Sequence, residues 1–136
     1  MANKKIEDVE GIGPVMGGKL REAGIKDTDG LLARTRTPAQ RKALAKACGL
    51  TYKQVLRFAN MVDLYRISGV GSEYAELLEA AGVDTVPELA RRRADNLARA
   101  MTDINTQRKL VRRTPTESEV ARWVADAKQL PRMLSY

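Results

Sequence analysis

Basic side chains gather in two stretches of this sequence, and the chemistry of such clusters is the binding of polyanions. Residues 33–57 carry seven lysines and arginines and no acidic residue, and residues 91–113 carry eight basic and two acidic residues. The whole chain has a formal charge of +7. A clustered positive charge favours an acidic partner such as nucleic acid. These two basic connectors supply the following candidate DNA-binding residues: Arg34, Arg36, Arg41, Lys42, Arg91, Arg92, Arg93, Arg112 and Arg113.

The same charges have a second explanation. The intervening residues 58–90 carry one basic and six acidic residues, so the connectors can instead pair with acidic helices. Glu73, Glu76 and Glu79 share one face of an expected helix, where they would repel a phosphate. Glu73 also complements the dipole at the start of that helix. Two hypotheses therefore stay open, a surface that contacts DNA and a set of ion-paired faces that join the halves or two chains.

Two residue types that often carry catalysis or bind metals, histidine and cysteine, are absent or scarce. The chain has no histidine, which removes the usual general base and the usual zinc ligand. Cys48 is the only cysteine, so no disulfide forms within the chain and no cysteine cluster binds a metal. We expect a non-enzymatic protein without metal or cofactor. No apolar run reaches membrane-spanning length and the N-terminus lacks a signal sequence, which predicts a cytoplasmic protein with no membrane partner.

Helix caps and helix breakers punctuate the whole chain, and no apolar–polar alternation predicts a strand. The sequence therefore predicts an all-α protein. We expect Ser72 to cap the helix that runs to Ala81, and Asn105 is a candidate break within residues 94–113. A Thr116–Glu119 capping box predicts the last helix. The expected helices cover about 14–23, 28–32, 38–48, 52–65, 72–81, a segment from 85 onward, 94–113 and 116–130.

One stretch occurs twice, at residues 9–25 and again at 67–83. In each copy an apolar residue precedes Gly-apolar-Gly, a helix-sized run follows, and Ala-Gly-apolar ends the unit. The repeat extends into the long helices, where Phe58 aligns with Trp123, and we expect both aromatic residues in the core. Such a repeat predicts two domains, 1–65 and 66–136. Neither half buries much core alone, so we expect a pseudo-two-fold, single compact domain.

This pattern resembles the helix-hairpin-helix motif. Nearly the whole chain looks like a bacterial family of tandem helix-hairpin-helix proteins that is catalogued as a domain of unknown function. The resemblance is carried by Gly11, Gly13, Leu20, Ala23, Gly24, Ile25 and Leu31, and by Gly69, Gly71, Ala75, Leu78, Ala81, Gly82, Val83 and Leu89.

The resemblance implies that the glycine turn presents backbone N–H groups to a DNA phosphate. Unpaired N–H groups at a helix N-terminus carry a partial positive charge that suits an oxyanion. Contact of this kind ignores base identity and weakens steeply with salt. The alternative is that the glycines only reverse the chain. The implied contact residues are Gly11, Ile12, Gly13, Gly69 and Gly71, with Lys19 and Arg21 on the helix after the first turn.

The leading hypothesis is therefore a non-enzymatic protein that binds DNA without sequence preference, through a glycine turn and the basic connectors. The alternative is a protein-interaction or scaffold module whose acidic second hairpin meets a basic partner or another copy of the chain.

Overall fold

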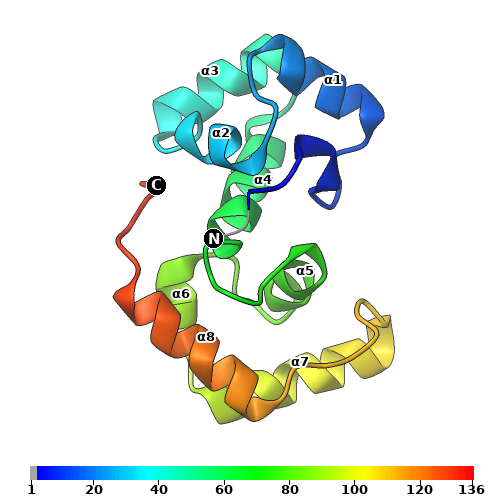
Figure 1. The fold of residues 1–136 in the computed structure, drawn as a ribbon, viewed down its shortest axis with the longest axis vertical. Helices are drawn as coiled ribbons and strands as arrows, with labels where there is room; N and C mark the ends of the chain where they lie inside the picture. The colour runs from blue at the N-terminus through cyan, green and yellow to red at the C-terminus, as the bar shows by residue number, and fades with distance from the viewer. Residues whose placement is uncertain (1–2) are drawn as a thin grey trace. The chain divides into compact units, whose positions relative to one another are not determined.

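The computed structural model describes residues 3–136, and every regular element among them is helical (Figure 1). This confirms the all-α prediction. The first two residues of the predicted domain 1–65 lie outside the described residues. The described chain divides into two compact units, an N-terminal unit of residues 3–63 with 133–136 and a C-terminal unit of residues 64–132.

The N-terminal unit consists of a short 3-10 helix and four α-helices. Side chains cap two of these helices. Thr37 and Gln40 form a reciprocal capping box at the start of α3, and Gly49 ends that helix with a φ of 66°. Asp27 accepts a hydrogen bond from the Gly30 N–H at the start of α2. The elements are η1 (Ile6–Asp8), α1 (Pro14–Glu22), α2 (Thr28–Ala33), α3 (Pro38–Cys48) and α4 (Tyr52–Leu64), the last of which reaches the C-terminal unit at its final residue.

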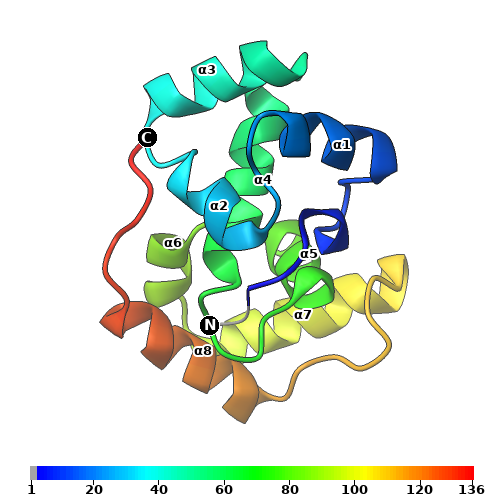
Figure 2. The same cartoon turned by 45° about the horizontal axis from the view of Figure 1, so that its top comes forward.

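Aliphatic side chains form the core of this unit. Ile6 and Ile25 are fully buried, and Leu20 and Leu44 are 1% and 2% exposed. Phe58 on α4 is 4% exposed, which confirms its assignment to the core. α1 packs against α3, and both helices can be followed in Figure 2.

The C-terminal unit contains α5 (Ser72–Ala80), α6 (Val86–Ala90), α7 (Ala94–Arg108) and α8 (Glu117–Gln129). α8 packs against α6 and α7, and α7 also packs against α5 (Figure 1). Trp123 on α8 is 3% exposed and therefore belongs to the core, as the repeat predicts.

Two predicted helix boundaries differ in the structure. The N-cap of α5 is Gly71, whose carbonyl accepts from the Ala75 N–H at 2.9 Å, and the Ser72 hydroxyl hydrogen-bonds the Tyr65 hydroxyl at 2.5 Å. The predicted helix 94–113 ends at Arg108, since Lys109 adopts a left-handed φ of 51°. Asn105 does not break the helix. Its side-chain amide donates to the Val111 carbonyl and accepts from the Val111 N–H, which closes the loop after α7.

The two copies of the repeated stretch share the same backbone geometry. Gly11 and Gly69 both have a φ of 90°, and Gly24 and Gly82 both have a φ of 91°. Residues with a side chain rarely adopt such angles, so these four positions require glycine. Each copy is therefore a glycine turn, a helix, a glycine stop and a second, shorter helix.

Candidate functional site

The first glycine turn leaves a group of backbone donors without acceptors. The Ile12 N–H donates to the Val9 carbonyl at 3.0 Å, and the Ile12 side chain is 3% exposed. This predicted contact residue anchors the turn to the core. Among residues 3–136 no acceptor faces the N–H groups at the start of α1 that belong to Gly11, Gly13, Val15 and Met16.

The second glycine turn repeats this arrangement in the C-terminal unit. The Val70 N–H donates to the Ile67 carbonyl at 3.1 Å, and the Gly71 N-cap is followed directly by α5. Within the described chain, the N–H groups of Gly69 and Gly71 have no acceptor. Glu73 lies in the first turn of α5, so a carboxylate adjoins these donors.

An aromatic side chain of the long helix lies against each turn. A Cβ on Gly11 would stand 3.3 Å from Phe58 Cε1 and 3.3 Å from Arg57 Nη1. A Cβ on Gly69 would stand 3.3 Å from Trp123 Nε1. The repeat register that aligns Phe58 with Trp123 thus places equivalent rings at equivalent glycines.

The two cations predicted on α1 differ in availability. Arg21 is held by the Glu7 carboxylate, to which its Nε and Nη2 donate at 2.7 and 2.6 Å. This pairing lowers the pKa of Glu7 to about 2. Lys19 is exposed and has no side-chain partner within residues 3–136. Only Lys19 is therefore ready to meet an anion without first breaking an ion pair.

In the first connector, Arg41 is completely buried, so it does not lie on a surface that DNA can reach. Its Nη1 donates to the Thr35 carbonyl at 2.8 Å, its Nη2 donates to the Ser135 carbonyl, and its Nε donates to the Tyr52 hydroxyl at 3.1 Å. The guanidinium also lies over the rings of Tyr52 and Tyr136. Arg41 thus fastens the C-terminal segment to its own unit.

The other cations of the first connector lie at the surface. Arg34 donates to the Ala23 carbonyl at 3.0 Å, so it caps the end of α1. Arg36 donates to the Met133 carbonyl at 3.3 Å. Lys42 is exposed on α3 and has no side-chain partner in the described chain.

In the second connector four of the five predicted DNA-binding cations already have a partner. Arg92 donates to the Ala81 carbonyl at 3.5 Å, which repeats the role of Arg34, and Arg91 donates to the Pro87 carbonyl at 3.3 Å. Arg93 pairs with Asp95 at 2.9 Å, and Arg113 binds both oxygens of Glu119. Within residues 3–136, Arg112 is exposed and has no such partner.

Two arginines that were not among the predicted site residues lie beside the glycine turns. Arg57 lies beside the first turn, as its distance from a Cβ on Gly11 shows. Arg122 lines a pocket with Gly69 beside the second turn. The signal was present in the repeat, because both arginines directly precede the aligned aromatic residues in the sequence.

Two further features of residues 3–136 concern metal binding and membrane insertion. No group of three or more cysteine, aspartate or glutamate side chains there could hold a metal ion. None of the helices in that range combines the length and the apolarity needed to cross a bilayer.

Comparison with known proteins places the chain in a family. A family model described as "Domain of unknown function (DUF4332)" matches residues 10–130. No curated protein and no solved structure gives a significant match. The family match spans both glycine turns, both connectors and α8. Because it covers most of the sequence, the chain belongs to the DUF4332 family.

Proposed function

We propose that this chain is a tandem helix-hairpin-helix protein that binds DNA through its phosphates, without base specificity and without catalysis. The observation that carries the proposal is the unpaired group of N–H donors from Gly11, Gly13, Val15 and Met16 at the start of α1. Such donors favour an oxyanion because the helix dipole adds to their partial charges. Gly13 leaves open space before them, since no atom lies within 4 Å of a Cβ placed there.

Charge favours the N-terminal unit as the DNA-binding half. Its described residues include twelve basic and seven acidic side chains, a net charge of +5, whereas residues 64–132 carry twelve and ten, a net charge of +2. Lys19 has no competing carboxylate, and the Arg57 guanidinium lies beside Gly11. We therefore assign the main phosphate contact to the first turn. The second turn, with Glu73 beside its donors, is the weaker site.

The other candidate cations fall into two groups, according to whether their side chains have a partner in the described chain. Lys42 and Arg112 have no side-chain partner in the described chain, and they support phosphate binding in this proposal. Arg34 and Arg92 keep the hairpins closed by binding helix-end carbonyls. A single basic surface formed by both connectors remains a prediction.

The test is fluorescence anisotropy of a labelled duplex between roughly 50 and 200 mM salt. We expect binding that falls steeply with salt. Lys19→Glu should weaken binding and reduce the salt slope by about one unit. Lys128→Glu, the same charge change on α8, is the matched control and should change affinity less.

Gly13→Val tests the backbone donors themselves. The φ of −87° at Gly13 is open to any residue, so the fold should survive, while the added side chain covers the donors. We expect lower affinity with a thermal midpoint close to that of the parent. No binding of the parent to any duplex at the lowest salt would overturn the proposed function.

A further inference from the structure

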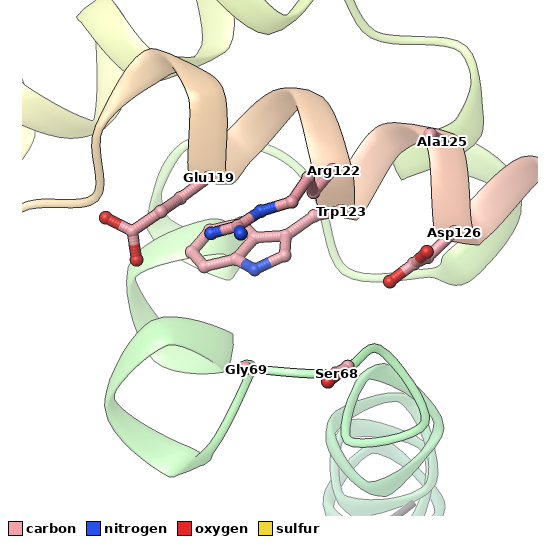
Figure 3. Close-up of a pocket in the computed structure, with 7 residues that line it drawn as sticks. All are labelled: Ser68, Gly69, Glu119, Arg122, Trp123, Ala125 and Asp126. Atoms are coloured by element: carbon pink, nitrogen blue, oxygen red, sulfur yellow. The ribbon is translucent and has the colours of Figure 1, made fainter.

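A pocket lies beside the second glycine turn, in the C-terminal unit (Figure 3). Its volume is about 320 Å³, which suits a ligand the size of one or two amino-acid residues. The turn supplies one wall and α8 supplies the other. The residues that matter here are Ser68, Gly69, Glu119, Arg122, Trp123 and Asp126.

Trp123 presents an unused donor to this pocket. The side chain is 97% buried, since 3% of the residue is exposed, and nothing in residues 3–136 accepts a hydrogen bond from its Nε1–H. In the described chain no fully enclosed side-chain nitrogen or oxygen lacks a partner, so this N–H opens onto the pocket. Figure 3 shows the nitrogen edge of the indole facing the Ser68–Gly69 backbone. The indole N–H therefore reaches solvent through the pocket, where a ligand oxygen can replace water as its acceptor.

Packing alone does not require this donor. At the equivalent place in the first repeat, Phe58 lies against Gly11 with a ring carbon at the same 3.3 Å from a built Cβ. A phenyl ring therefore fills that position. The indole N–H is thus one chemical difference between the two turns.

The charges around the pocket restrict the ligand. Asp126 and Arg122 are exposed and make no ion pair or hydrogen bond with their side chains in residues 3–136. Glu119 is already bound by Arg113. Among the described residues, Asp126 is therefore the one carboxylate of this pocket without a cation, and its charge disfavours a phosphate. A neutral oxygen acceptor next to a cation suits the indole N–H, the guanidinium and the free carboxylate together.

We propose that this turn pocket binds a basic peptide segment. A backbone carbonyl of the peptide accepts from Trp123 Nε1–H, and a lysine or arginine side chain of the peptide pairs with Asp126. Arg122 supplies further donors to the neighbouring peptide carbonyl. The site is distinct from the DNA contact at the first turn, so either proposal can fail alone.

The full chain labelled with ¹⁵N provides a direct readout, because its one tryptophan gives one indole N–H resonance. The probes are a blocked pentapeptide of alternating glycine and lysine, the same peptide with glutamate for lysine, and inorganic phosphate. We expect the lysine peptide to move the indole proton downfield and to saturate, at concentrations up to about 10 mM. The glutamate peptide and phosphate should leave it in place. No shift with the lysine peptide, or an equal shift with phosphate, overturns the proposal.

Two variants test the contacts by anisotropy of the labelled lysine peptide. Asp126→Asn should weaken binding by about threefold, because the exposed pair between Asp126 and the peptide lysine loses one of its charges. Trp123→Phe installs the ring of the first repeat and should weaken binding by roughly fivefold through loss of one hydrogen bond. Asp103→Asn is the control, an exposed carboxylate on α7 outside the pocket, and should have no effect. If all three variants bind equally, the peptide lies elsewhere and the proposal is wrong.

Discussion

At the scale of single residues, two carboxylates owe their lowered pKa values to one arginine each. Arg21 lowers the pKa of Glu7 to about 2, and Arg113 does the same for Glu119, chiefly through side-chain hydrogen bonds. Both folded pKa values lie below the ordinary 4.5. The stability from these pairs is therefore present above pH 4.5 and is lost as pH falls towards 2.

We predict that Glu7→Gln flattens the fall in urea midpoint across this acidic window. In an Arg21→Gln background the same substitution should add nothing, because the cation that lowers the pKa is gone. Urea unfolding at several pH values measures both effects. An equal slope in parent and Glu7→Gln would show that the pair does not contribute in solution.

The same substitution has a second consequence for binding. Glu7→Gln releases the Arg21 guanidinium, which both oxygens of Glu7 now hold. We predict tighter DNA binding and a steeper salt dependence by up to about one unit. Titration of labelled duplex with the variant checks this. Unchanged affinity would place Arg21 outside the DNA contact.

Arg41 is buried, unlike the arginines of these two surface pairs, so its removal should lower the stability of the protein more. We predict that Arg41→Met lowers the free energy of unfolding by roughly 2–4 kcal/mol, because the carbonyls of Thr35 and Ser135 and the Tyr52 hydroxyl lose a donor. Lys42→Met, the exposed neighbour, should change it by less than about 0.5 kcal/mol. Urea unfolding compares the two. Equal effects would mean that the buried guanidinium is not needed.

At the scale of helices, two adjacent glycines in α1 offer a matched comparison. A Cβ at Gly18 meets open space, so Gly18→Ala should stabilise the protein by about 0.5–1 kcal/mol through helix propensity. A Cβ at Gly17 would stand 2.7 Å from Glu7 Oε2, so Gly17→Ala displaces the carboxylate from Arg21. We expect a smaller gain at Gly17 and a weaker pH dependence. Thermal unfolding at neutral and acidic pH separates the two.

Local sequence signals predict these elements well where a cap is made within a few residues. The box of Thr116 with Glu119 forms as the spacing predicts, and Thr37 caps α3 in a second box with Gln40. Prediction fails where a distant group competes. The Ser72 hydroxyl turns to Tyr65, and the sequence around Lys109 gives no warning of its left-handed backbone.

Some features of the candidate site could likewise be predicted from the sequence, and others could not. The glycine turns follow from their spacing, since four positive φ values recur at repeated positions. The burial of Arg41 does not follow, because its acceptor on Ser135 is 94 residues away in the sequence. Ion pairing likewise removes Arg21 and Arg113 from the freely available cations, and neither partner is adjacent in sequence. Counting charges locates a basic segment but does not say which charges are free.

At the scale of the whole molecule, the chain leaves the N-terminal unit after residue 63 and returns to it for its last four described residues. Leu134 is 2% exposed, and the Ser135 N–H donates to the Arg36 carbonyl at 2.8 Å. The Tyr136 hydroxyl donates to Asn60 Oδ1 at 2.6 Å. Residues 133–136 thus form a C-terminal strap that packs on the N-terminal unit, although they follow the C-terminal unit in the sequence.

Removal of this strap should therefore loosen one unit more than the other. Cys48 reports on the N-terminal unit, since the residue is 4% exposed and burial raises the pKa of its thiol, and Trp123 reports on the C-terminal unit. We predict that a chain of residues 1–132 reacts at Cys48 with an aromatic disulfide reagent roughly 100-fold faster, as a loss of about 3 kcal/mol in local opening would give. The unfolding midpoint followed by Trp123 fluorescence should move far less. Tyr136→Phe, which removes only the hydroxyl that binds Asn60, should raise the thiol rate by a smaller factor. Equal loosening at both probes would contradict a local strap, because the contacts of residues 133–136 described above all lie within the N-terminal unit.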